Sequence, residues 1–324
     1  MTDSLLSSPE FVSRTFHFLT FITVPVNMLG AYCILFKTPK SMSSVKLVIL
    51  NLHLCSMTLD IVFSVLIQPV VFFPAVAAYS NGVLKVFGKC AGIELYFAGT
   101  MFAVVSMSIV SVMENRFYLL FVINTLWRKI RPFVLFFNYF VACTFLIPLL
   151  LQAPNQIIAF EIIQKKFPDI PFSSYSDSLF IFSVDSSYVF LSVFLTGALT
   201  VSQINLYCFL IILNMRKLSS NGKMSQRTYH LQRRFLIAIG IQIFTPLIVL
   251  FVPATYLDFC FIFEYYNQAV NNICMILISF HGWVSAIVMM FIHEPYRKFC
   301  LNILDFQMYG KGTKPISVQS IVIH

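Results

Sequence analysis

The sequence predicts an all-α membrane protein, a bundle of seven transmembrane helices followed by a short amphipathic helix. Hydrophobic residues make up 58% of the 324 residues and charged residues only 11%, whereas a soluble domain carries about 25% charged residues. Seven apolar runs are long enough to cross a hydrocarbon core of about 30 Å, which takes about 20 helical residues. The basic residues are also concentrated in alternate connections, as expected for a protein that crosses a bilayer repeatedly.

The seven runs divide the chain into a bundle and its flanking segments. The bundle covers residues 15–292, between an extracellular segment 1–14 and a juxtamembrane segment 293–306, and a cytoplasmic tail covers 307–324. We expect the first run to be retained as a span, because it is too long for a signal peptide and lacks a small-residue cleavage site. The predicted spans are 15–36, 47–73, 90–115, 133–154, 187–213, 235–256 and 268–292.

Two segments outside the spans have recognisable patterns. Connection 155–186 is the longest and contains Pro168, Pro171 and a Ser/Tyr/Asp cluster, which predicts a loop over the outer mouth of the bundle. After span seven, Pro295 suits the first turn of a new helix, with Glu294 beside its positive end. Apolar and polar residues then alternate as in an amphipathic helix that lies on the inner leaflet.

The distribution of basic residues predicts the orientation. Connections 37–46, 116–132 and 214–234 and the tail hold 17 of the 22 Lys and Arg residues, and the segments on the other side hold 5. The positive-inside rule therefore places the N-terminus outside and the tail in the cytoplasm. Because this asymmetry accounts for the net charge of +9, nucleic acid is excluded as a partner, whereas the lipid bilayer is required.

Span two carries a polar stripe. Five polar residues recur every three or four positions, so they share one helical face. Ionisable groups in a bilayer usually face the bundle interior, and Asp60 lies about 21 Å from Lys46 along the helix. Two interpretations stay open: Asp60 binds an ion or a water network and biases packing, or it only holds helices together. The stripe comprises His53, Ser56, Asp60, Ser64 and Gln68.

Span three places one acidic residue near each face of the membrane. Glu94 lies near its outer end, and Glu114 follows about 30 Å further along the helix, two residues before Arg116. Glu94 is either a ligand contact or a solvated residue at the rim. Glu114 and Arg116 form either an anchor at the interface or, together with Asp60, a conformational switch.

Two further groups of residues are candidates for binding. Polar and aromatic residues in the outer half suit a ligand pocket, although each also suits ordinary packing: Glu94, Tyr96, Phe97, Thr100, Tyr188, Tyr256, Gln268, Asn271 and Asn272. Basic residues on the inner side suit a protein partner or anchoring to anionic lipid headgroups: Arg116, Arg128, Lys129, Arg131, Arg216, Lys217, Arg233 and Arg234.

Three classes of function fit seven spans. An intramembrane metal hydrolase needs His and carboxylates at one depth, but His17, His53 and His281 show no metal-ligand spacing. A retinal pump needs a lysine in span seven, which 268–292 lacks. A transporter usually has interrupted helices in symmetric halves, and we find none. We therefore favour a receptor, with no enzyme activity, cofactor or metal; a transporter, a channel or a hydrolase remains the alternative.

Four motifs carry a resemblance that covers nearly the whole chain. They are Phe36-Lys37-Thr38-Pro39-Lys40-Ser41-Met42, Asn51-Leu52-His53, Glu114-Asn115-Arg116 and His293-Glu294-Pro295-Tyr296-Arg297-Lys298-Phe299. Together they resemble the nematode serpentine chemoreceptors of class H. The resemblance implies a G protein-coupled receptor fold, a small-molecule ligand from the environment, a heterotrimeric G protein as partner, and the plasma membrane of sensory cilia.

Comparison with rhodopsin-like receptors shows overlap and departure. Glu114-Asn115-Arg116 occupies the place of the acid–Arg motif, with Asn115 inserted, and Asp60 resembles the aspartate of the sodium pocket. Span seven lacks Asn-Pro-x-x-Tyr, and connection 155–186 has no cysteine to meet Cys90. Our hypothesis is that Glu114 or a neighbouring helix holds Arg116 in the inactive state and releases it toward the G protein.

Overall fold

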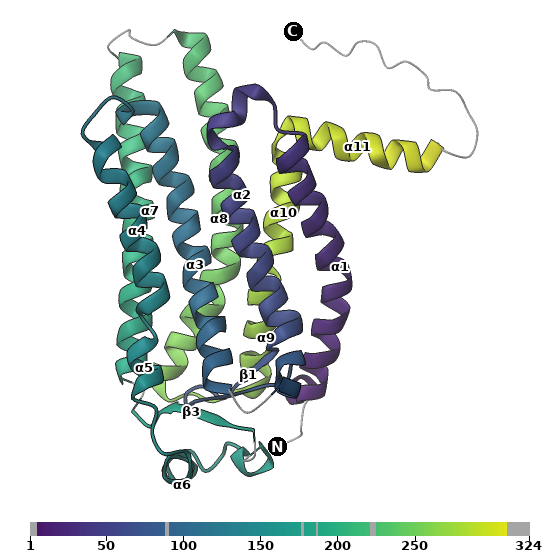
Figure 1. Ribbon diagram of the computed structural model, residues 1–324, viewed down its shortest axis with the longest axis vertical. Helices are drawn as coiled ribbons and strands as arrows, with labels where there is room; N and C mark the ends of the chain where they lie inside the picture. The colour runs from purple at the N-terminus through teal and green to yellow at the C-terminus, as the bar shows by residue number, and fades with distance from the viewer. Residues whose placement is uncertain (1–4, 88–90, 176–177, 186, 221–224, 310–324) are drawn as a thin grey trace.

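The computed structural model describes residues 5–87, 91–175, 178–185, 187–220 and 225–309, and it confirms the predicted helical membrane fold. The helices of the bundle run side by side (Figure 1). They are α1 (Pro9–Phe36), α2 (Ser43–Ile61), α3 (Ala91–Phe117), α4 (Trp127–Thr144), α5 (Ile147–Leu151), α7 (Ser187–Ser220), α8 (Gln226–Phe263), α9 (Gln268–Ser279) and α10 (His281–Ile292). The short α5 continues the direction of α4 (Figure 1).

The helices account for the seven predicted runs. Within the described residues, five segments are long and apolar enough to cross a membrane: Pro9–Phe36, Ser43–Leu66, Ala91–Val122, Trp127–Leu151 and Ser187–Leu218. Helices α9 and α10, with a bend of 40° between them, are together long and apolar enough to form one further span. The remaining run lies in α8, which contains the apolar stretch Leu247–Phe263.

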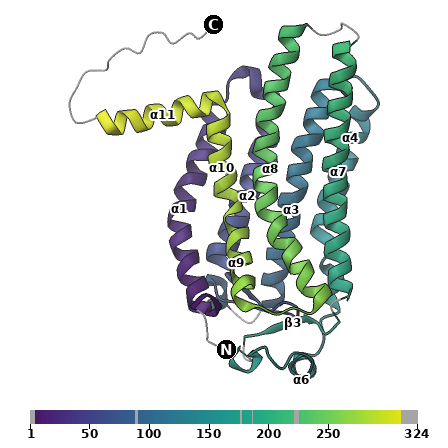
Figure 2. The same cartoon turned by 180° about the vertical axis from the view of Figure 1, so that it is seen from behind.

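Helix α3 is the centre of the bundle. It packs against α2, α4 and α7, and Figure 2 shows it behind α8 and beside α7. Every residue from Val105 to Phe117 is buried. A helix that is buried on all sides needs side chains that are apolar or fully hydrogen-bonded, so the charged residues near its end require partners in neighbouring helices.

The two ends of the bundle differ. Helix α11 (Glu294–Tyr309) runs across one end of the bundle, and the start of α1 lies at the other end (Figure 1). Tyr296 is fully buried, and its hydroxyl lies 2.7 Å from that of Thr38 at the end of α1. We call the end of the bundle at which α11 lies the α11 end, and the opposite end the sheet end.

A three-stranded antiparallel sheet lies at the sheet end and corrects the predicted span two. Strand β1 (Pro69–Val71) pairs with β2 (Val76–Ser80), and β2 pairs with β3 (Phe180–Ser183). The prediction of a span over 47–73 was therefore too long. The helix continues from Ile61 as the π-helix Val62–Leu66, and Gln68 then adopts a φ of 46° immediately before Pro69, where a helix is disfavoured.

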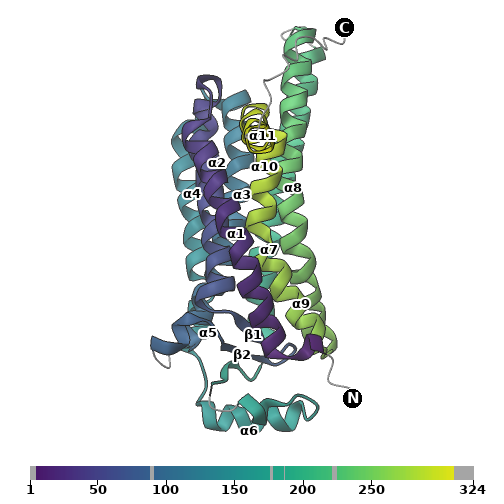
Figure 3. The same ribbon diagram turned by 90° about the vertical axis from the view of Figure 1, so that its right-hand side faces the viewer.

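The predicted loop 155–186 contains regular structure. Its first part is α6 (Gln156–Lys166), whose N-cap Asn155 accepts hydrogen bonds from the backbone of Ile157 and Ile158. Gln156 holds β3 by donating to the carbonyl of Ile181 and accepting from its N–H. Figure 3 shows α6 lying across the strands, outside the bundle. The segment does cover the sheet end, but as a helix and a strand.

The sheet packs on two sides. Val70 and Tyr79 contact α6 residues in a small hydrophobic core, whereas Val71 and Ala78 belong to the core of the bundle. This alternation follows from the period of two in a β-strand. The sheet is therefore a lid, held between α6 and the helices.

Short helical turns complete the fold. The 3-10 turns are Leu5–Ser7, Lys40–Met42, Val83–Phe87 and Phe172–Tyr175, and α3 continues as a second π-helix, Tyr118–Val122.

Candidate functional site

The polar stripe of span two faces the bundle interior, as predicted. All five members are at most 4% exposed. Asp60 is fully buried, and its Oδ2 accepts a hydrogen bond of 3.0 Å from Asn27 Nδ2 of α1. His53 Nε2 lies 2.9 Å from the carbonyl oxygen of Asn27. The stripe therefore connects α1 and α2 at mid-height in the bundle.

Asp60 also caps the second half of span seven. Its Oδ1 accepts a hydrogen bond of 2.9 Å from the backbone N–H of Gly282, at the start of α10. The first N–H groups of a helix have no partner within it, and they carry partial positive charge that suits a carboxylate. The chain bends at Phe280, so Asp60 supplies the cap that the bend requires.

Gly282 is required at this cap. A Cβ on residue 282 would overlap the carboxylate of Asp60. The close approach of the α10 backbone to α2 thus depends on the absence of a side chain. These contacts support the interpretation that Asp60 holds helices together.

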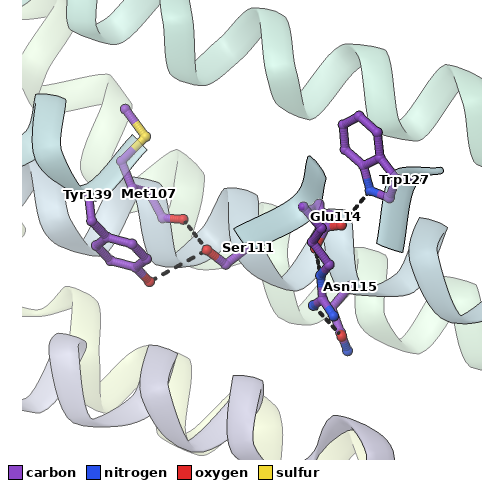
Figure 4. Close-up of polar contacts among 7 residues, drawn as sticks. Met107, Ser111, Glu114, Asn115, Trp127 and Tyr139 are labelled. Atoms are coloured by element: carbon purple, nitrogen blue, oxygen red, sulfur yellow. Dashed lines mark hydrogen bonds and ion pairs between the residues drawn. The ribbon is translucent and has the colours of Figure 1, made fainter. Parts of the chain in front are cut away.

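At the α11 end, α4 provides the partners of Glu114. The carboxylate is buried, with 1% of the side chain exposed. Its Oε1 accepts a hydrogen bond of 2.8 Å from the indole of Trp127, and its Oε2 accepts one of 2.7 Å from Arg131 Nε. Figure 4 shows the Trp127 indole directed at Glu114 across the space between the two helices. The charge of Glu114 is therefore neutralised from α4.

Arg131 is fixed by further contacts. Its Nη2 donates a hydrogen bond of 2.7 Å to Asn115 Oδ1, and its guanidinium carbon lies 4.4 Å from the ring centroid of Tyr118. One arginine thus bridges an acid, an amide and an aromatic ring. We call Glu114, Asn115, Tyr118, Trp127 and Arg131 the Glu114 cluster. Asn115, which comparison with rhodopsin-like receptors treated as an insertion, is thus a hydrogen-bond acceptor for Arg131.

A second group of polar contacts between helices lies around Ser111, about one turn before Glu114 in α3. Ser111 Oγ lies 3.0 Å from the carbonyl oxygen of Met107 and 3.5 Å from the hydroxyl of Tyr139 in α4 (Figure 4). Asn51 of α2 donates a hydrogen bond of 2.7 Å to the same hydroxyl. Tyr139 therefore connects α2, α3 and α4 close to the Glu114 cluster.

Arg116 belongs to a different environment from Glu114. It is 7% exposed. Its positive charge reaches His293, which joins α10 to α11: burial first, and then the charge of Arg116, lower the pKa of His293 to about 4. The structure therefore places Glu114 against α4 and Arg116 near the end of span seven.

The other basic residues of the inner group lie at the α11 end and point outward. Arg128 and Lys129 at the start of α4, Arg216 and Lys217 at the end of α7, and Arg233 of α8 are exposed. Arg234 is also in α8, but its side chain lies outside the described part, as does all of Cys90. Among the described residues, no three His, Cys, Asp or Glu side chains are grouped to hold a metal ion.

Comparison with known proteins identifies the family. The family model described as "Serpentine type 7TM GPCR chemoreceptor Srh" matches residues 7–306. The chain belongs to the Srh family. It is also 23% identical over 316 residues to serpentine receptor class H-72 of Caenorhabditis elegans, an alignment that covers 92% of this chain and 87% of that receptor. The chain is thus a multi-pass membrane protein of a chemoreceptor family, as the four motifs implied.

In this Srh protein, several predicted pocket residues tie the lid to α9. Gln268 Nε2 donates to the carbonyl of Val71 at 3.1 Å, and Asn271 Nδ2 donates to that of Phe73 at 3.0 Å. Asn272 Nδ2 donates to the carbonyl of Leu6 at 2.8 Å. The three side-chain amides thus donate hydrogen bonds to the backbone of the β1–β2 hairpin or of the segment before α1.

The remaining predicted pocket residues are dispersed. Tyr96 donates a hydrogen bond to the carbonyl of Cys143, and Phe97 and Tyr188 are exposed. Glu94 and Thr100 are buried in α3, and Tyr256 is half-buried in α8.

A cavity of about 190 Å³ lies beneath the sheet, and its lining includes none of these nine residues. Sequence reasoning missed this cavity because it looked for polar and aromatic residues within the spans, whereas the lining is apolar and comes partly from strands. The signal for the lid was present: Pro69 and Pro74 interrupt a run rich in Val and Phe, which favours a strand over a buried helix.

Proposed function

We propose that this Srh receptor binds an extracellular chemical at the sheet end and signals to a heterotrimeric G protein at the α11 end. The observation that carries the proposal is the Glu114 cluster, in which the buried Glu114 of α3 forms an ion pair with Arg131 of α4. A buried acid that depends on one arginine gives a structure two alternative states, paired and released.

Charge distribution supports the orientation. The α11 end bears exposed Arg128, Lys129, Arg216 and Lys217, and the connections and tail predicted to be cytoplasmic together hold 17 of the 22 basic residues. The N-terminus would then be outside and the tail in the cytoplasm of a plasma membrane, which for a chemoreceptor is that of a sensory cilium. These basic residues would face the G protein or the anionic headgroups.

The proposed mechanism is a shift between two populations. A ligand shifts the equilibrium only by its difference in affinity between the states. In the inactive state, Arg131 bridges α3 and α4 at Glu114, and Arg116 remains buried near His293. In the active state, the helix ends separate, Arg131 leaves Glu114, and Arg116 is exposed to the G protein. Asp60 keeps α2 and α10 together during this movement, because its contacts lie at mid-height.

The experiment expresses the receptor in cells with a panel of G proteins and measures G-protein dissociation by energy transfer. An N-terminal epitope, stained on intact cells, tests the orientation and measures surface expression. We expect staining without permeabilisation and ligand-dependent dissociation of one G-protein class. An N-terminal epitope accessible only after permeabilisation would contradict the orientation, and surface receptor that activates no G protein with any chemical pool would contradict the function.

A further inference from the structure

The cavity beneath the sheet occupies the place where an extracellular ligand would enter the bundle. Strands β1, β2 and β3 form its outer wall, and most of the remaining lining comes from α3, α5, α7, α8, α9 and the π-helix after α2. In Figure 3 the strands lie between α6 and the ends of the helices. A molecule in this cavity would therefore touch the lid and several spans at once, which is what a ligand must do to shift their packing.

The lining is apolar throughout. Every residue that contacts the cavity is Phe, Leu, Val, Met, Ala, Pro or Gly. Three polar side chains predicted for a ligand pocket hydrogen-bond to the backbone instead: Gln268 and Asn271 donate to the lid, and Tyr96 donates to α4. A polar group of a ligand would thus lose its hydrogen bonds to water without replacement, which costs about 1–3 kcal/mol.

The volume limits the size of the ligand. Drug-sized ligands occupy pockets of roughly 300–1,000 Å³, which is more than the 190 Å³ found here. An engineered apolar cavity of about 150 Å³ stays dry and binds benzene or xenon. The cavity here is moderately larger, which suits a benzene ring with a short alkyl substituent.

We propose that the cavity beneath the sheet is the ligand site, and that it takes a small apolar molecule without hydrogen-bonding groups, from benzene to a short alkylbenzene in size. The proposal rests on the proposed receptor function and specifies its ligand class. Ala98 of α3 is the best position for testing it, because it lines the cavity and is 4% exposed.

The experiment measures fluorobenzene binding to the purified receptor in lipid nanodiscs by ¹⁹F NMR, with empty nanodiscs to subtract partition into lipid. Ala98→Leu fills the cavity, and Ala198→Leu is the matched control, the same change at an exposed position of α7. Leu257→Ala enlarges the cavity from α8. No G protein is present, so the result does not depend on whether the receptor signals.

We expect saturable binding to the wild type and to Ala198→Leu, at least tenfold weaker binding to Ala98→Leu, and displacement by toluene at a concentration at least tenfold below that of phenol. Leu257→Ala should bind isopropylbenzene at least fivefold more tightly than the wild type does. If Ala98→Leu does not fold, this comparison tests the proposal in its place, and equal binding of isopropylbenzene to Leu257→Ala and the wild type would overturn it. Four results would overturn the proposal: no saturable binding to the wild type, equal binding to Ala98→Leu, equal displacement by phenol, or a lipid chain found in the cavity by mass spectrometry.

Discussion

Breaking the Glu114 cluster should activate the receptor without a ligand. Arg131→Ala removes the guanidinium that bridges Glu114 and Asn115, so the paired state loses its main contact between α3 and α4. In the released state Arg131 has no such contact to lose. In the proposed mechanism the substitution therefore destabilises the inactive state selectively, and we expect a higher basal signal.

The size of the effect follows from the contacts. Hydrogen bonds to charged groups contribute about 1.5–3 kcal/mol, and a cation–π contact such as that with Tyr118 about 0.5–1 kcal/mol. Arg131 is 22% exposed, so water screens part of this energy, and we take about 2 kcal/mol, a factor of about 30. If the active state is populated at about 1% at rest, the substitution raises it to about 20%.

The assay is basal G-protein dissociation per receptor at the surface, normalised by the N-terminal epitope. Arg128→Ala is the matched control, because Arg128 is exposed in the same helix and an exposed charge contributes little. Glu114→Gln should raise the basal signal as well. Because both changes break one contact, the double variant should be less active than the product of the two single effects. An unchanged basal signal at equal surface expression, or independent effects in the double variant, would refute the reasoning.

Three further substitutions test other parts of the site. Arg116→Ala should abolish ligand-driven signalling while surface expression stays normal; unchanged signalling would remove Arg116 from the switch. Gly282→Ala should lower the melting temperature of the purified receptor, by an overpacking cost of about 1–3 kcal/mol, because the new methyl group overlaps Asp60; Gly197→Ala, which meets open space, should not. His293 has a pKa of about 4 in the folded state and about 6.5 in the unfolded chain, so on acidification the unfolded chain takes up the proton first. The free energy of unfolding should therefore fall by about 3 kcal/mol between pH 6.5 and 4. His293→Phe should flatten this pH dependence, and an equally steep slope in that variant would contradict the assignment to His293.

The spans were predictable because the bilayer imposes a strong constraint on the sequence. A segment that crosses it must satisfy its backbone internally and present an apolar surface, so α1, α3 and α7 are visible as uninterrupted apolar runs. The face of span two was predictable for a similar reason, since Asp60 cannot face lipid without a large cost.

The lid was not predicted, because hydropathy does not distinguish an apolar strand from the end of an apolar helix. Residues 69–73 are as apolar as the span that precedes them, and only the prolines and the β-branched residues indicate a strand. The pairing of β2 with β3, which lies more than 100 positions further along the chain, depends on tertiary contacts. The same lack of contact information concealed that Asn271 and Gln268 donate hydrogen bonds to the backbone of the lid.

The separation of Glu114 from Arg116 does follow from helical geometry. Residues two apart on an α-helix point about 200° apart, and such pairs do not face each other. The inserted Asn115 therefore directs the acid toward α4 and the arginine toward the end of span seven, and the two charges take part in different contacts. Their contributions to stability should then be independent: in purified receptor, the losses caused by Glu114→Gln and Arg116→Ala should add within about 0.5 kcal/mol, whereas those of Glu114→Gln and Arg131→Ala should not. Coupling between Glu114 and Arg116 as strong as that between Glu114 and Arg131 would show that the acid holds Arg116 after all.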